Sequence, residues 1–102
     1  MDASRPQSQP RPQAQSKVQV DNDRVRVTEW RFPPGAETGW HAHEHDYVVV
    51  PQSTGKLELE TLDGHTFSVL EAGVSYYRDK GAEHNVVNAN DSEFVFVEIE
   101  LK

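Results

Sequence analysis

Hydrophobic and polar residues alternate with a period of two along most of the chain from Lys17 onward. The alternation is clearest in 24–32, 57–61 and 94–101, and Gly, Pro, Asn or Asp residues separate these segments. A period of two is typical of strands with one buried face, and no window has the 3.6-residue apolar period of an amphipathic helix. The pattern therefore predicts an all-β fold, a sandwich or barrel of short strands.

A hairpin is expected in the middle of the chain. Asp63-Gly64 is a two-residue turn signal, and alternating segments at 57–61 and 65–70 flank it. The final segment, 94–101, is expected to form the last strand. Its even-numbered residues are two phenylalanines and two glutamates on one face, opposite a face of aliphatic residues.

The first sixteen residues have a different composition. They are mostly Pro, Gln, Ser and Arg, with very little apolar surface to bury. Such a segment does not offset its own ordering entropy, so residues 1–16 are predicted to be a disordered tail. The remaining 17–102 suffices for one small domain.

Charge and composition narrow the classes of partner and compartment. The net charge is −7, and because the tail contributes +1 the remaining domain carries −8. An acidic domain repels phosphate, so neither nucleic acid nor an anionic membrane surface is expected as a partner. The chain has no cysteine and its beginning has no apolar core of a secretory signal, which favours a cytoplasmic location.

Three of the five histidines stand at alternate positions before an apolar run. In a continuous strand, His41, His43 and His45 would point to the same side. Imidazole is a good ligand for zinc, iron, nickel, copper and manganese, so this face is a candidate metal site. Alternating histidines also occur on exposed edges, and His65, beside the predicted turn, is expected to be solvated surface.

The spacing of residues around these histidines closely resembles the first motif of the cupin family, G-x5-H-x-H-x3-4-E-x6-G. A second stretch resembles the second motif of that family, G-x5-P-x-G-x2-H-x3-N, with Asp79 at the proline position. The matching positions are Gly35, His41, His43 and Gly55 in the first motif, and Gly73, Gly81, His84 and Asn88 in the second.

This resemblance implies a single cupin domain, an RmlC-like jelly-roll β-barrel over 17–102 with a metal held in its mouth. Carried over residue by residue, it implies that His41, His43 and His84 are the metal ligands. The family's fourth ligand is a glutamate, whose position falls here on Tyr47 or Val48, depending on the gap. Neither side chain is a good metal ligand.

Several nearby groups are alternatives for the fourth ligand. His45, Glu44 and Asp46 each follow the H-x-H pair closely, and His45 is expected nearer the rim. Without a fourth protein ligand, three neutral imidazoles leave the charge of the ion uncompensated and positions open for water, substrate or dioxygen.

Within the cupins, three-histidine sites resemble those of thiol and diketone-cleaving dioxygenases, which hold ferrous iron. The resemblance thus implies a metal-dependent enzyme acting on a small molecule, with Fe(II)-dependent oxygenation first and Zn, Ni or Mn as other metals. The alternatives are a non-catalytic barrel that binds a small molecule, and a metal-free dimerisation barrel. Small cupins commonly form homodimers, so a homodimer is expected.

Inward-facing positions of the barrel supply the expected pocket. Tyr47, Tyr76, Arg78 and Phe96 are candidates for its lining, and Val86 and Asn88 are expected to face inward with His84. Arg78 is expected to point outward and pair with a surface acid. If it faces inward beside a cation, an anion must join the two, which suggests a carboxylate-bearing ligand.

Overall fold

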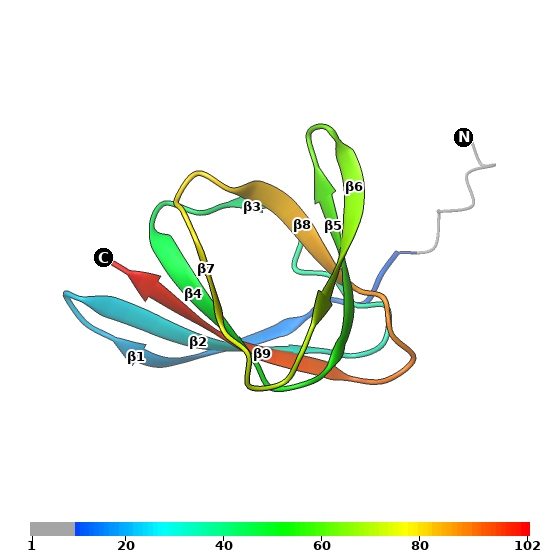
Figure 1. The fold of residues 1–102 in the computed structure, drawn as a ribbon, viewed down its shortest axis with the longest axis horizontal. Coiled ribbons are helices and arrows are strands. Elements are labelled where there is room, and N and C mark those ends of the chain that lie inside the picture. The colour runs from blue at the N-terminus through cyan, green and yellow to red at the C-terminus, as the bar shows by residue number, and fades with distance from the viewer. Residues whose placement is uncertain (1–9) are drawn as a thin grey trace.

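The computed structural model describes residues 10–102, and within them the chain forms nine strands and no helix (Figure 1). No helix in this part of the chain therefore has the length and hydropathy needed to cross a bilayer. The prediction of an all-β fold is confirmed. The strands are β1 (Gln15–Asp21), β2 (Val25–Phe32), β3 (His41–Ala42), β4 (Asp46–Pro51), β5 (Gly55–Thr61), β6 (Gly64–Leu70), β7 (Tyr76–Arg78), β8 (Glu83–Asn88) and β9 (Phe94–Leu101).

The strands form two sheets that face each other across the interior (Figure 1). One sheet has five strands in the order β1-β2-β9-β4-β7, and the other has four in the order β3-β8-β5-β6. All strand pairs are antiparallel. Sequence neighbours are often not sheet neighbours, as β9 lies between β2 and β4, which is the connectivity of a jelly roll.

The core lies between the inward faces of the two sheets. Phe32, Phe94 and Phe96 come from the large sheet, and Leu57 and Val86 from the small one; all five are buried. The rings of Phe32 and Phe96 pack with their centroids 5.4 Å apart. Each buried phenyl contributes about 1.5–3 kcal/mol by leaving water, so these alternate positions hold the sheets together.

Asn88 of β8 fastens the two sheets together. Its side chain is 1% exposed, and its amide donates hydrogen bonds to the carbonyls of Phe32, Pro33 and Ser92 at 3.1, 3.2 and 2.9 Å. A buried amide is stable only when its hydrogen bonds are made, and here they join β8 to the end of β2. The motif asparagine therefore has a structural role.

The ordered chain begins earlier than the sequence pattern suggested. Gln15 and Ser16 already belong to β1, Ala14 is buried, and Gln13 forms a bridge with Glu37. Backbone pairing holds this segment, and composition does not reveal backbone pairing. The expectation of disorder is therefore wrong for residues 10–16, and the rest of the predicted tail, residues 1–9, lies outside the described residues.

The predicted hairpin joins β5 and β6, with the turn one residue earlier than expected. Thr61 pairs with Gly64, so Leu62 and Asp63 are the two turn residues. Gly64 has a φ of +126°, a conformation that other residues rarely adopt. The glycine therefore ends the turn rather than occupying its centre.

Candidate metal centre

Two backbone arrangements bring the three motif histidines together. His41 of β3 and His84 of β8 are directly opposite each other in their antiparallel pair. His43 lies just after β3, where its N–H donates to the Ala82 carbonyl and its carbonyl accepts the Gly81 N–H, both at 2.9 Å. Gly81 has a φ of +97°, which allows the turn before β8 to reach this position.

The Nε2 atoms of the three imidazoles converge on one point. His43 Nε2 lies 3.1 Å from His41 Nε2 and 3.3 Å from His84 Nε2. Nitrogens that share one ion at metal–nitrogen bonds of about 2.1 Å would lie about 3.0–3.4 Å apart, and the observed separations match this range. Three ring nitrogens this close are stable only with a proton or a cation between them, so the donor set fits a transition metal.

The second ring nitrogen of His41 is fixed by the backbone. Its Nδ1–H donates to the Gly39 carbonyl at 2.9 Å, and because a carbonyl only accepts, the proton is on Nδ1. The other ring nitrogen, Nε2, then faces His43 and His84. Metal-bound histidines commonly make such a hydrogen bond through their other nitrogen.

The environment keeps His43 and His84 neutral. Burial lowers the pKa of His43 to about 4, and electrostatic interaction with His41 and then Arg78 lowers it further. Burial also lowers the pKa of His84 to about 4, and electrostatic interaction with His41, His43 and Arg78 lowers it further. Both imidazoles are therefore available as metal ligands at neutral pH.

The three alternatives for a fourth ligand on 44–46 lie away from this point. β3 ends at Ala42 and the chain bends at Glu44 and His45, so the strand alternation that would have aligned His45 with His41 is interrupted. His45 and Glu44 line a separate surface groove with Arg26 and Glu100. Asp46 Oδ1 instead accepts the Lys80 backbone N–H at 2.8 Å.

Tyr47 occupies the inward position near the missing glutamate. Its side chain is 2% exposed, and its ring stacks on His43 with centroids 4.0 Å apart and 20° between the planes. Burial raises the pKa of Tyr47 to about 12. The hydroxyl therefore stays protonated at neutral pH, and the residue supports a ligand without supplying an anionic one.

A small cavity lies beside the histidines inside the barrel. It has a volume of about 20 Å³, room for one water-sized group. Its lining includes all four residues that were predicted to line a pocket, together with His84, one of the predicted metal ligands. The lining residues are Tyr47, Val49, Leu57, Leu59, Tyr76, Arg78, His84, Val86, Phe96 and Glu98.

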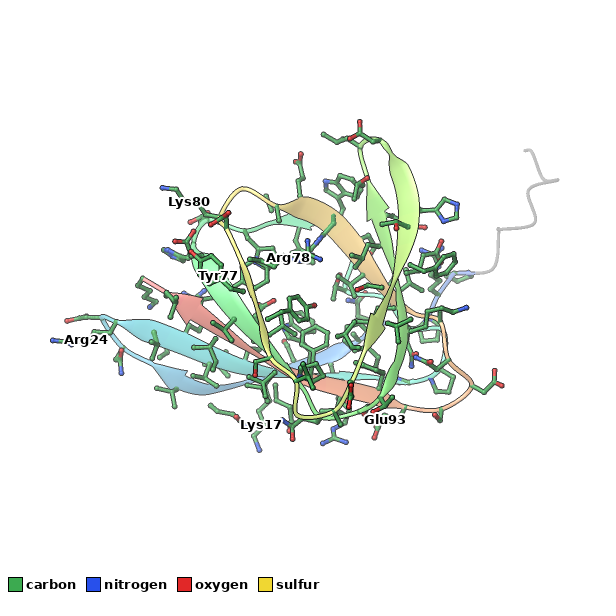
Figure 2. All side chains as sticks on the ribbon, in the orientation of Figure 1. Lys17, Arg24, Tyr77, Arg78, Lys80 and Glu93 are labelled. Atoms are coloured by element: carbon green, nitrogen blue, oxygen red, sulfur yellow. The ribbon has the colours of Figure 1, made fainter. Side chains whose placement is uncertain are left out.

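Arg78 points into this cavity, contrary to the expectation that it faces outward. Figure 2 shows its side chain directed from β7 into the space between the sheets, with Tyr77 on the other side of the strand. The guanidinium carbon lies 5.6 Å from the centroid of the Tyr76 ring. Within residues 10–102 no carboxylate lies within 4.0 Å of Arg78.

Glu98 is a member of the site that the motif comparison missed. It comes from β9, is 9% exposed, and its Oε2 lies 3.9 Å from His43 Nε2. Burial raises the pKa of Glu98 to about 7, the negative charge of Glu100 adds to the rise, and Trp30 offsets part of it. The sequence held a signal for it, because Glu98 shares its strand face with Phe94 and Phe96.

A wider groove opens on the other side of the histidines. It has a volume of about 320 Å³, and its wall includes His41, His43 and Glu98. Glu98 also lines the inner cavity, so it stands between the two spaces. The remaining lining residues are Ser16, Val18, Arg26, Thr28, Trp30, Thr38, Ala42 and Glu100.

Comparisons with known proteins agree with this architecture. The family model described as "Cupin domain" matches residues 28–100. Among curated proteins, the β-alanine degradation protein BauB of Pseudomonas aeruginosa is 61% identical over 92 residues, which covers 90% of this chain and 97% of that protein.

Solved structures of cupin and double-stranded β-helix proteins are also similar to this chain. The crystal structure of a cupin domain from Bordetella pertussis has a TM-score of 0.90 and 64% identity, and covers 91% of this chain and 97% of that one. A double-stranded β-helix protein from Klebsiella pneumoniae has a TM-score of 0.73 at 24% identity, over 87% of this chain and 76% of that one, and shows similarity of fold alone.

Proposed function

The chain belongs to the cupin family, and on that basis we propose that it is a metal-dependent dioxygenase acting on a small carboxylate. The observation that carries the proposal is the convergence of three imidazole Nε2 atoms, with that of His43 3.1 and 3.3 Å from the other two. His41, His43 and His84 would hold the ion. Zinc, nickel and manganese also accept imidazole ligands, and Fe(II) is our first choice.

Iron at this position would supply dioxygen activation, and three neutral ligands support that choice. They leave the charge of the ion uncompensated and leave coordination positions for a substrate group and dioxygen. The residues of the chain supply the surroundings. Apolar side chains line most of the inner cavity, which excludes bulk water from the reacting groups.

The charge of Arg78 indicates the class of substrate. This guanidinium faces the cavity that His84 lines, and its charge lowers the pKa of both His43 and His84. A second positive charge beside a metal ion is costly unless an anion joins the two. A carboxylate is a suitable anion, because its two oxygens match the guanidinium fork.

The sizes of the two spaces favour a short substrate. The inner cavity has room for one small group, whereas the outer groove of about 320 Å³ accommodates the rest of a molecule. BauB is described as a β-alanine degradation protein. β-Alanine is a three-carbon carboxylate, and we propose that this chain acts on a carboxylate of similar size in the breakdown of such compounds.

Metal analysis and oxygen uptake test this proposal in two steps. We expect purified protein to hold close to one transition metal per chain, and anomalous scattering at the metal edges to identify it between the three imidazoles. Iron-loaded protein should then consume dioxygen with a short thiol- or diketone-bearing carboxylate, and a His84→Ala variant should not. Metal-free protein that cannot be loaded contradicts the metal site, and loaded protein without oxygen uptake contradicts the dioxygenase.

A second candidate role, a dimerisation barrel, is favoured by β1. Every residue of this edge strand is exposed, and Val18 and Val20 are 54% and 43% exposed. An exposed edge with apolar side chains is a template for pairing with a second copy. Light scattering should give twice the chain mass of 11.6 kDa for the wild type, and the monomer mass for a Val18→Lys, Val20→Lys variant. A monomeric wild type contradicts this role.

A further inference from the structure

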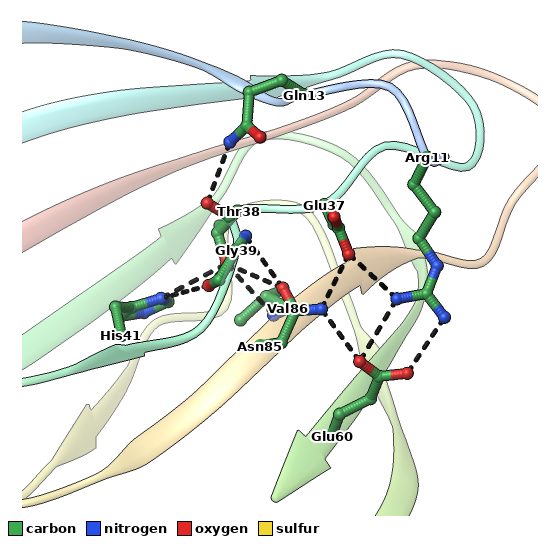
Figure 3. A network of polar contacts seen from close by, with 9 residues as sticks. All are labelled: Arg11, Gln13, Glu37, Thr38, Gly39, His41, Glu60, Asn85 and Val86. Carbon is green, nitrogen blue, oxygen red and sulfur yellow. Dashed lines mark hydrogen bonds and ion pairs between the residues drawn. The ribbon is translucent and has the colours of Figure 1, made fainter. Parts of the chain in front are cut away.

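A chain of hydrogen bonds leads from His41 through Gly39 to Asn85 of β8, and from there through two carboxylates to Arg11 (Figure 3). The His41 Nδ1–H donates to the Gly39 carbonyl at 2.9 Å. The Gly39 N–H in turn donates to Asn85 Oδ1 at 2.9 Å. Asn85 therefore holds the N–H of Gly39, the residue whose carbonyl accepts from the His41 ring, and among the described residues it makes no hydrogen bond with the ring itself.

Asn85 uses both ends of its amide. Its oxygen also accepts from the Thr38 hydroxyl at 3.4 Å, and its nitrogen donates to Glu37 Oε1 and Glu60 Oε1, each at 2.9 Å. The residue is 6% exposed. With both N–H groups donated and the oxygen doubly engaged, only one orientation of the amide satisfies the site.

The carboxylates of Glu37 and Glu60 both accept from the amide nitrogen of Asn85, and Arg11 compensates their charge. Its Nη1 donates to Glu37 Oε1 at 2.9 Å and to Glu60 Oε1 at 3.2 Å, and its Nη2 donates to Glu60 Oε2 at 2.9 Å. Hydrogen bonds from Arg11 and then Asn85 hold the pKa of Glu60 below its usual range. Without Arg11, the two carboxylates would repel each other across the amide of Asn85.

The backbone holds Arg11 in place. The Glu37 N–H donates to the Pro12 carbonyl at 2.9 Å, and the Ala14 N–H donates to the Glu37 carbonyl at 2.8 Å. The Gln13 side chain donates to the Thr38 carbonyl at 2.9 Å. We call residues 11–14 the N-terminal strap, since they cross the segment that leads to His41.

We propose that Arg11 of the N-terminal strap and Asn85 are positioning residues for the metal centre, which hold His41 as the Nδ1–H tautomer with its Nε2 directed at the ion. This goes beyond the proposed function, because it holds for any metal and any reaction at the three histidines. Loss of partners behind a metal ligand typically weakens metal binding about 10- to 100-fold.

The direction of the change in metal affinity distinguishes the loss of a positioning contact from the loss of a positive charge. Removing a positive charge close to a cation site by itself strengthens cation binding. An Arg11→Gln variant that binds metal more weakly therefore reports the loss of an oriented ligand. Arg31→Gln is the matched control, since Arg31 makes an exposed pair with Glu93 at 2.9 Å and lines none of the spaces around the histidines.

The experiment is a zinc titration of the full-length, metal-stripped chain by calorimetry. We expect Arg11→Gln and Asn85→Ala to raise the Kd at least about 10-fold, and Arg31→Gln to change it less than about 2-fold. Adding Glu60→Gln to Arg11→Gln should recover part of the affinity, because it removes one of the two facing charges. Equal Kd values for Arg11→Gln and Arg31→Gln overturn the proposal.

A second readout does not depend on metal. In the metal-free wild type, long-range ¹H–¹⁵N spectra should show His41 as the Nδ1–H tautomer, and Arg11→Gln should give a mixture of tautomers. Should Arg11→Gln not fold, Arg11→Lys, which keeps the charge and loses the fork, takes its place in both measurements. An unchanged His41 tautomer in the variants overturns the proposal even where the Kd rises.

Discussion

Tyr47 lies flat against His43, with 4.0 Å between the ring centroids and 20° between the ring planes. Tyr47 is one of the two positions at which the motif resemblance places the glutamate of the family, and here the side chain makes a stacking contact. It restrains the ring of one ligand and adds no negative charge. Since Tyr47 also lines the inner cavity, it shapes both the ligand and the space beside it.

Removing the Tyr47 ring should affect both stability and metal binding. Tyr47→Ala leaves a cavity in the core and is expected to lower the free energy of unfolding by about 3–5 kcal/mol and to weaken zinc binding. Tyr47→Phe keeps the stacked ring and should bind zinc with wild-type affinity, because the protonated hydroxyl is not a ligand. Urea unfolding and calorimetry measure the two effects, and weakened binding in Tyr47→Phe would show that the hydroxyl takes part.

The three histidines should act as a unit in metal-dependent stability. At a metal concentration 100 times the Kd, binding stabilises the folded wild type by about 2.7 kcal/mol. His41→Ala, His43→Ala and His84→Ala should each lose most of this gain, measured as the rise in Tm on adding metal. His65→Ala is the control, since this side chain is 59% exposed and contacts Glu58 at 2.9 Å. A full metal-dependent rise in His84→Ala would contradict the site.

Acid should destabilise the metal-free protein through His43 and His84. Their folded-state pKa values of about 4 lie below the usual 6.5, so the unfolded chain binds more protons between these values. The stability that their neutral forms provide is complete above pH 6.5 and is lost as pH falls toward 4. Urea unfolding in chelator across this range should show the loss, and a His43→Ala variant should show less of it.

Glu98 should have the opposite pH dependence. Its folded-state pKa of about 7 lies above the usual 4.5, so its contribution is complete below pH 4.5 and is lost as pH rises through 7. Glu98→Gln keeps the neutral form at all pH values, and in metal-free protein it should gain about 1–3 kcal/mol relative to wild type between pH 4.5 and 8. A stability difference that does not change with pH would contradict a buried, neutral Glu98.

Substituting Arg78 should affect anion binding and the histidines together. Arg78→Leu is expected to weaken binding of a short carboxylate to metal-loaded protein about 10- to 100-fold, because a charge-assisted pair is lost. The pKa values of His43 and His84 should rise in the metal-free variant, since Arg78 contributes to lowering both. Calorimetry and NMR titration of the imidazoles measure these effects. Unchanged carboxylate affinity would separate Arg78 from the substrate.

Much of this protein was predictable from local sequence. Strand alternation predicted which residues share a face, and the spacing of residues within each of the two motifs predicted the candidate ligands, because both depend on neighbours a few positions apart. Alternation alone did not give the direction of Arg78, which points inward. Alternation also predicted that His45 would point to the same side as His41. This prediction does not hold, because the chain leaves the strand after Ala42 and the alternation ends there.

Only the tertiary structure decided what surrounds those ligands. Glu98 comes from β9, and Arg11, Glu37, Glu60 and Asn85 meet from four different parts of the chain, so no local pattern relates them. Arg11 stands in a segment whose composition predicts disorder, yet the backbone of Pro12 and Ala14 pairs with Glu37, and the Arg11 guanidinium pairs with Glu37 and Glu60. Periodicity assigns a side chain to a face, whereas the packing of one sheet against the other determines which charges that face meets.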